Sequence, residues 1–189
     1  MLMLGFESSA KAASVALYKD GKFLSEYTQV SGLTHSRTLL PMAEDMLKNA
    51  DLSVNDVDVF AVTVGPGSFT GLRIGIATVK GLCWGGDKPC VGVSTLEALA
   101  YNAIDLDGII CPCMDARRNQ VYNALFRGEN GKITRITDDR PIELDKLIEE
   151  LKAYSDEKIY LVGDGAGLAH KFFEDKGLNT RLCSENIRW

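Results

Sequence analysis

The order of apolar and polar positions predicts the same series of elements twice along the chain. The first half predicts three strands in a meander, a helix, a buried strand, a second helix and a short strand, at residues 2–8, 12–19, 22–29, 35–49, 58–64, 69–84 and 90–93. The second half predicts another meander, then a helix, a strand and a helix, at residues 109–114, 120–126, 132–136, 143–153, 158–162 and 166–176. The pattern therefore indicates a duplicated βββαβα unit.

Chemically similar residues occupy corresponding places in the two halves. A carboxylate follows the first strand each time, as Glu7 and Asp115, and a Gly-Lys pair closes a hairpin in each half. A buried strand then leads into a glycine turn and a helix, at residues 64–67 and again at 162–165. We therefore expect an α/β protein with two RNase H-like lobes, residues 1–104 and 105–189. Two such lobes resemble the actin-like ATPase and sugar kinase (ASKHA) fold, and a fold alone does not set the function.

The turn after the strand at 58–64 carries the most specific sequence of the chain. Gly65 and Gly67 permit backbone dihedral angles that other residues avoid, and Ser68 is placed to cap the following helix. A helix start behind a glycine-rich loop suits an anion. The spacing fits neither the P-loop nor the dinucleotide fingerprint, and the turn after the first strand has no glycine. The weak candidates for a phosphate loop are Glu7, Ser8, Ser9, Gly65 and Gly67.

Composition limits the kinds of partner. The 189 residues carry a net charge of −5 without a dense patch of Lys and Arg, which argues against independent binding of RNA. No apolar stretch reaches the ~20 residues of a membrane span, and no signal peptide opens the chain. A cytoplasmic protein without membrane association is therefore expected.

The sequence offers no pattern for a metal site or a nucleophile. Five cysteines lack the spacing of a zinc site, and Cys111 and Cys113 are interpreted as buried on one face of a strand. The two histidines, His35 and His170, belong to no metal-binding motif. Ser68 lacks the flanking glycines of a nucleophile elbow. We expect no metal and no catalytic residue.

The helices at 35–49 and 69–84 are the strongest functional clue. The second helix is apolar around its circumference, with only Arg73 and Lys80 charged, so two of its sides are expected to be buried. Either the chain's own helices or a second protein covers the side away from the sheet. The candidate partner-binding residues are Leu39, Met42, Ala43, Met46, Leu72, Arg73, Gly75, Ile76 and Val79.

The second helix also has two glycines four residues apart. Gly71 and Gly75 would leave a flat patch on which another helix backbone could pack. We therefore expect a large charged residue at Gly75 or Ala77 to abolish pairing with a partner and to leave the chain itself folded.

With these motifs assembled, the chain resembles the TsaB family of bacterial proteins, also called YeaZ. The string from Gly65 to Gly75, GPGSFTGLRIG, matches the family's most specific motif. Residues 4–9, 93–100 and 114–122 match further family segments. The resemblance extends over essentially the whole chain.

The resemblance implies a non-catalytic subunit in the synthesis of N6-threonylcarbamoyladenosine (t6A) at position 37 of tRNA. The implied partners are a catalytic TsaD-type paralogue, which pairs through the helices at 35–49 and 69–84, and a small TsaE-type ATPase. Contact with tRNA would be indirect, through the complex. No cofactor is expected to bind tightly. The sequence leaves open whether ATP or ADP binds at the interface with the partner, and whether the chain alone forms a homodimer through the same helices.

The chain departs from the family pattern in two places. Glu7 replaces the more frequent Asp, and relatives continue beyond residues 186–189 with a helix that returns to the first lobe. A truncated chain with an open apolar groove is therefore expected. Two alternative functions stay open. One is a self-sufficient ASKHA-type ATPase or phosphotransferase, with Asp115 as second carboxylate, and the other is an M22-type glycopeptidase.

Overall fold

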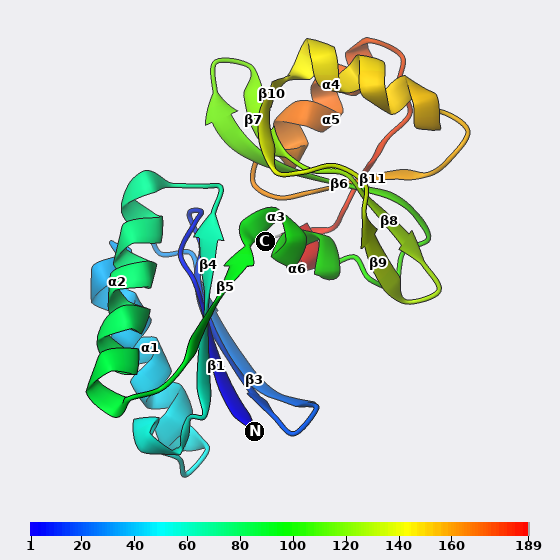
Figure 1. Ribbon diagram of the computed structural model, residues 1–189. Coiled ribbons are helices and arrows are strands. Elements are labelled where there is room, and N and C mark those ends of the chain that lie inside the picture. The colour runs from blue at the N-terminus through cyan, green and yellow to red at the C-terminus, as the bar shows by residue number, and fades with distance from the viewer. Residues whose placement is uncertain (189) are drawn as a thin grey trace. The chain divides into compact units, whose positions relative to one another are not determined.

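The computed structural model describes residues 1–188. Trp189, where the expected truncation falls, lies outside the described residues. The chain forms two compact units, which divide between Val93 and Ser94 (Figure 1). Each unit is built around one β-sheet that carries helices. Among the described residues, no helix has both the length and the apolar character needed to cross a membrane.

The boundary expected from the sequence, between residues 104 and 105, lies too far along the chain. The short helix α3 (Thr95–Tyr101) packs against β6 (Gly108–Arg117) and β9 (Lys132–Arg135). The Arg135 guanidinium on β9 donates a hydrogen bond to Glu97 Oε2 on α3, at 3.1 Å. The hydroxyl oxygen of Ser94 caps α3 by accepting the Glu97 N–H at 3.2 Å. α3 therefore belongs to the second unit.

The first unit has the βββαβα order that its hydrophobic pattern predicts, followed by one more strand. Its elements are β1 (Leu2–Glu7), β2 (Ala13–Lys19), β3 (Lys22–Gln29), α1 (His35–Asn49), the 3-10 turn η1 (Val54–Asp56), β4 (Val59–Gly65), α2 (Phe69–Gly86) and β5 (Cys90–Ser94). The strands form one sheet in the order β3-β2-β1-β4-β5. β2 pairs antiparallel with β1 and β3, and β4 pairs parallel with β1.

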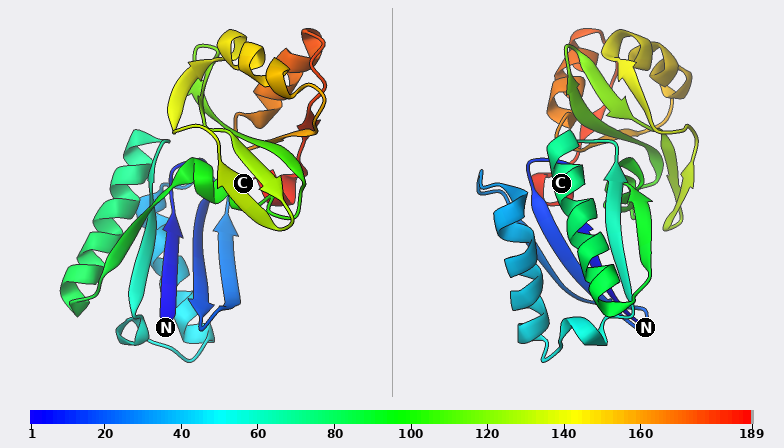
Figure 2. Two further views of the ribbon diagram at one scale, coloured as in Figure 1. Left: turned by 45° about the vertical axis from the view of Figure 1, so that its right-hand side comes forward. Right: turned by 60° about the vertical axis from the view of Figure 1, so that its left-hand side comes forward.

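One face of this sheet is covered by α1 and α2, which lie side by side (Figures 1 and 2). Successive side chains of a strand point to opposite faces, so every second residue of β1 and β2 points to the helices. These residues meet the inward sides of both helices in one core, formed by Leu2, Leu4, Phe6, Val15, Leu17, Leu39, Ala43, Met46, Phe60, Val62 and Val79 among others. The core thus fixes which side of each helix faces outward.

The second unit repeats the βββαβα order. After α3 its elements are β6, β7 (Gln120–Asn123), β8 (Phe126–Glu129), β9, β10 (Arg140–Glu143), α4 (Leu144–Leu151), the 3-10 turn η2 (Lys152–Tyr154), β11 (Ile159–Val162), α5 (Ala166–Asp175), β12 (Arg181–Leu182) and α6 (Glu185–Arg188). The sheet has the order β10-β7-β6-β11-β12, and β8 pairs with both β6 and β9. β7 with β8, and β9 with β10, take the places of β2 and β3. The duplication predicted from the sequence is confirmed.

The single strand expected at residues 120–126 is wrong, because the chain is interrupted between β7 and β8. The partner strand β6 contains Pro112, which has no N–H to donate to a neighbour. The side-chain amide of Asn123 donates to the Pro112 carbonyl oxygen instead, at 2.9 Å. The Leu125 N–H then donates to the Thr137 hydroxyl at 2.8 Å. The strand therefore breaks where the ladder to β6 is interrupted.

Cys111 and Cys113 lie on the same face of β6, as predicted. Their sulfur atoms are 3.8 Å apart, and both side chains are buried in the core of the second unit. The neighbouring Cys111 thiol and burial raise the pKa of Cys113 well above its ordinary value. Cys113 is thus held in the thiol form, and the two buried side chains pack as small apolar groups.

Candidate partner-binding surface

The start of α2 is built from the glycine turn. Gly65 and Gly67 have φ angles of 116° and 156°, within the range that favours glycine. Ser68 is the N-cap of α2, and its hydroxyl oxygen accepts the Gly71 N–H at 3.2 Å. This cap confirms the role that the sequence predicts for Ser68, and it fixes the direction in which α2 leaves the sheet.

The glycines of α2 face the interior of the first unit. A Cβ atom on Gly71 would lie less than 3.0 Å from the Ser8 carbonyl oxygen, and one on Gly75 equally close to the Ser8 hydroxyl. A Cβ atom on Gly67 would lie 2.5 Å from the Ser9 carbonyl oxygen. These glycines let the turn between β1 and β2 pack on the α2 backbone. The expectation of a flat outward patch at Gly71 and Gly75 is therefore wrong.

The structure separates the nine predicted partner-binding residues into two groups. Met42, Leu72 and Ile76 are half-buried and Arg73 is exposed, so these four reach the outer side of the helices. The other five lie in the interior, where no partner can reach them in this structure: Leu39, Ala43, Met46, Gly75 and Val79. The expectation that Gly75 tolerates a large charge is also wrong, because a side chain there would meet Ser8.

The outward side of α2 carries a row of exposed side chains that was not predicted as a group from the sequence. Phe69 is 68% exposed and Trp84 is 90% exposed. The Arg73 guanidinium lies 3.7 Å from the centroid of the Phe69 ring, in a cation–π contact. We call the exposed residues spaced three or four apart along α2 the outer stripe, namely Phe69, Arg73, Ala77, Lys80 and Trp84.

The neighbouring helix α1 adds exposed apolar surface. Leu40 is 48% exposed, and Pro41 beside it is exposed as well. On the same helix Arg37, Glu44 and Asp45 face outward. The two helices therefore expose apolar and charged side chains together.

Comparison with known proteins identifies the family. A protein of Bacillus subtilis named tRNA threonylcarbamoyladenosine biosynthesis protein TsaB is 34% identical over 175 residues, which cover 93% of this chain and 76% of the relative. The chain belongs to the TsaB family. An Escherichia coli relative with the same name is 38% identical over 134 residues, which cover 69% of the chain and 58% of that protein.

The family model of TsaD, described as tRNA N6-adenosine threonylcarbamoyltransferase, matches residues 28–182. Among solved structures, YeaZ from Pseudomonas aeruginosa aligns with a TM-score of 0.82 and 26% identity, covering 97% of this chain and 84% of that one. The actin-like fold class expected from the duplicated unit is confirmed. TsaB and TsaD are thus related in sequence, and the chain matches both.

In this TsaB-family chain four of the five weak phosphate-loop candidates, Glu7, Ser8, Ser9 and Gly67, lie at the turn between β1 and β2. Ser8 and Ser9 are buried. The Ser8 hydroxyl donates to the Gly71 carbonyl oxygen at 2.9 Å, and the Ser68 N–H donates to the Ser9 carbonyl oxygen at 2.6 Å. The Glu7 carboxylate accepts the Ser9 N–H. The Ser8 hydroxyl and the Ser9 carbonyl oxygen thus hold the turn on α2 and its N-cap. Among the described residues, the Ser9 hydroxyl is buried without a hydrogen-bond partner.

His35, His170 and Asp115 each make a local contact. His35 Nε2 lies 2.9 Å from the Ala10 carbonyl oxygen, and His170 Nδ1 lies 2.8 Å from the Thr180 hydroxyl oxygen. Asp115 accepts the Arg117 N–H at 2.7 Å. Over residues 1–188, no group of three or more His, Cys, Asp and Glu side chains could hold a metal ion.

Proposed function

We propose that the chain is a non-catalytic subunit that pairs with a catalytic threonylcarbamoyltransferase paralogue during t6A37 modification of tRNA. The relatives named for threonylcarbamoyladenosine biosynthesis support the pathway. The matching transferase family model supports a partner of the same fold. A small ATPase of the TsaE type completes the proposed assembly, which would work in the cytoplasm, where tRNA is modified.

The observation that carries the proposal is the outer stripe of α2. Large aromatic side chains and arginine dominate the binding energy of protein interfaces, and the stripe presents both in one row. Phe69 and Trp84 are exposed to 68% and 90%, although this unit has a core that could have taken apolar side chains from α2. Apolar exposure of this kind on a helix beside a second amphipathic helix fits a helix-against-helix interface. The same surface would serve a homodimer when the partner is absent.

Two features support the absence of independent catalysis. In the candidate phosphate turn between β1 and β2, the Ser8 hydroxyl and the Ser9 carbonyl oxygen already bond to Gly71 of α2 and to its N-cap Ser68. The carboxylates expected of an ATPase, Glu7 and Asp115, each accept a backbone N–H of their own turn. We therefore propose that the isolated chain binds no nucleotide tightly, and that ATP or ADP would bind only once the partner contributes to the site.

The experiment is a reconstituted t6A assay on a tRNA transcript, supplied with threonylcarbamoyl-adenylate. We expect no t6A from the chain alone, little from the paralogue alone and sustained formation when both and the ATPase are present. The variant Glu7→Gln/Asp115→Asn removes both candidate carboxylates of the alternative ATPase function. Unchanged t6A formation by this variant is expected, and product formed by the chain without the paralogue would overturn the proposal.

A further inference from the structure

The turn between β6 and β7 has an unusual backbone. Arg117 pairs with Gln120, so Arg118 and Asn119 form a two-residue hairpin loop. Their φ angles are 52° and 58°, and Arg117 before them has a φ of 67°. Three consecutive residues with side chains thus occupy the left-handed region, which such residues visit singly rather than in runs. We call Arg117, Arg118 and Asn119 the arginine turn.

The other tight hairpins of the chain use glycine for the same geometry. The loop between β2 and β3 is Asp20-Gly21, with φ angles of 50° and 81°. The loop between β8 and β9 is Asn130-Gly131, with φ angles of 51° and 69°. Asp-Gly and Asn-Gly are the residue pairs that such turns prefer. The arginine turn keeps two long cationic side chains where glycine would fit better, which points to a use for those side chains.

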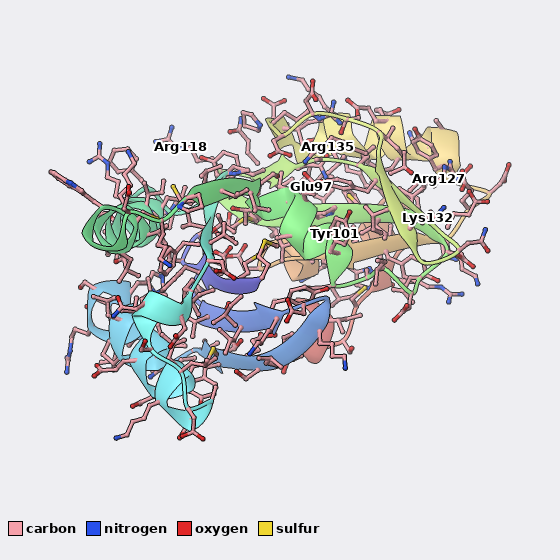
Figure 3. The ribbon with its side chains drawn as sticks, turned by 60° about the horizontal axis from the view of Figure 1, so that its bottom comes forward. Glu97, Tyr101, Arg118, Arg127, Lys132 and Arg135 are labelled. Atoms are coloured by element: carbon pink, nitrogen blue, oxygen red, sulfur yellow. The ribbon has the colours of Figure 1, made fainter. Side chains whose placement is uncertain are left out.

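The arginines of the turn also differ in their partners from three other arginines of the second unit, Arg127, Arg135 and Arg140. Arg127 donates two hydrogen bonds to the Glu157 carboxylate, at 2.6 and 3.0 Å. Arg135 binds Asp139 and Glu97, and Arg140 binds Glu150. Among residues 1–188, neither guanidinium of the arginine turn contacts a carboxylate, and both side chains are exposed. In Figure 3 the Arg118 side chain extends away from the ribbon, whereas Arg135 lies beside Glu97.

The backbone of the turn is fixed at both ends. The Arg117 N–H donates to Asp115 Oδ1 at 2.7 Å, and the Leu144 N–H at the start of α4 donates to the Asn119 carbonyl oxygen at 3.1 Å. The Asp115 N–H donates to Asp164 Oδ1 at 3.1 Å. The side chains of two consecutive arginines are therefore exposed on a backbone that is fixed at both ends. Asp115 is the acidic residue whose side chain accepts a hydrogen bond from the backbone of the turn.

We propose that the arginine turn binds phosphate groups of an RNA backbone. In the assembly, this RNA is the tRNA substrate. A guanidinium is planar, always charged and able to donate two parallel hydrogen bonds to a phosphate. The net charge of −5 shows why the chain alone would hold RNA poorly, so the turn acts beside a partner surface that supplies most of the affinity. The inference rests on the proposed function for its RNA and goes beyond it, because that function assigned this chain no contact with tRNA.

The test measures tRNA binding to the chain paired with its paralogue at several salt concentrations. The variant Arg117→Ala/Arg118→Ala is expected to weaken binding about tenfold and to lower the slope of log affinity against log salt by about 1 to 2, since each lost phosphate contact removes about 0.7 to 0.9. The control Lys132→Ala/Lys171→Ala removes the same charge from two exposed positions of the second unit and should leave both values unchanged.

A second measurement separates function from structure. The variant Arg118→Gly relieves the left-handed strain, so its melting temperature should rise by about 2–4 °C while its paired form binds tRNA more weakly. A lower melting temperature would show that Arg118 is there for the fold, and the inference would fail.

The outcomes also distinguish the two proposals. If the pair forms and the arginine variants bind tRNA with an unchanged salt slope, the inference is overturned and the proposed function stands. If the variants keep tRNA binding and lose the paralogue or the ATPase, the arginines bind a protein and the assignment to RNA is wrong. Failure of the wild-type chain to pair overturns the proposed function and this inference with it.

Discussion

At the scale of single residues, glycines decide how the first unit is built. Gly71 and Gly75 of α2 have no space for a Cβ atom, because the β1–β2 turn packs directly on the helix backbone. Gly81, on the same helix, has no atom within 4 Å of the position that a Cβ would take. The sequence does not distinguish these three glycines of one apolar helix, and only packing separates them. This is why the outward patch predicted at Gly71 and Gly75 was wrong.

These glycines give a matched pair of variants. Gly71→Ala should destabilise the protein by about 2–4 kcal/mol, because its Cβ would overlap the Ser8 carbonyl oxygen. Gly81→Ala should instead stabilise it by about 0.5–1 kcal/mol, since alanine favours the helix and meets nothing there. Urea unfolding followed by circular dichroism measures both. Equal effects of the two substitutions would contradict the packing of the turn on α2.

The cysteines give a second prediction at this scale. The Cys111 thiol and burial raise the pKa of Cys113 well above its ordinary value, so the reactive thiolate is disfavoured as long as the unit is folded. Cys90 is exposed. At mildly alkaline pH, a chromogenic disulfide reagent should therefore modify Cys90 rapidly, and Cys111 and Cys113 only after denaturant is added. Rapid modification of Cys113 in the native protein, located by mass spectrometry, would contradict its burial.

At the scale of elements, sequence patterns predicted the strands and caps well and the helix orientation poorly. The Asp20-Gly21 hairpin, the Ser68 cap and the Ser94 cap follow from local chemistry, which a short segment contains in full. The orientation of α2 does not follow from local chemistry. Because this helix is apolar on every side, its sequence does not indicate which side packs on the sheet. The break between β7 and β8 depends on Pro112 of another strand, so no local pattern contains it.

The outer stripe gives a prediction for α2 as an element. Trp84→Ala removes the most exposed aromatic side chain of the stripe and should weaken binding of the paralogue about 30-fold, the effect of an aromatic anchor residue. Phe23→Ala is the matched control, because Phe23 on β3 is 61% exposed but lies outside the helix layer. Isothermal titration of the paralogue gives both affinities. If Phe23→Ala lowered the affinity for the paralogue as much as Trp84→Ala, the assignment of the interface to α2 would be contradicted.

At the scale of the whole molecule, the duplicated pattern was sufficient to predict the fold class. The repeated strand, turn and helix segments predict the order of the elements in both units. In each unit the first strand then pairs parallel with the strand after the helix, β1 with β4 and β6 with β11. The boundary between the units could not be predicted as well. It depends on the packing of α3 and on the ion pair of Glu97 with Arg135, which are distant in sequence.

Net charge is a property of the whole molecule as well, and it makes its own prediction. With a charge of −5 and its basic side chains dispersed, the chain alone should not bind tRNA at physiological salt. Fluorescence anisotropy of a labelled tRNA should stay constant when the chain is added and should rise only when the paralogue is added as well. Micromolar binding by the chain alone would contradict the division of roles between the two subunits.

The central claim is that the outer stripe of α2 is the surface on which the paralogue binds, and light scattering after size exclusion tests it directly. The measurement compares the wild-type chain with Ala77→Glu, which places a charge in the middle of the stripe at an exposed helix position. We expect the wild type to elute with the paralogue as a one-to-one complex, and Ala77→Glu to elute separately with unchanged circular dichroism and melting temperature. A one-to-one complex of Ala77→Glu, as stable as that of the wild type, would contradict the claim.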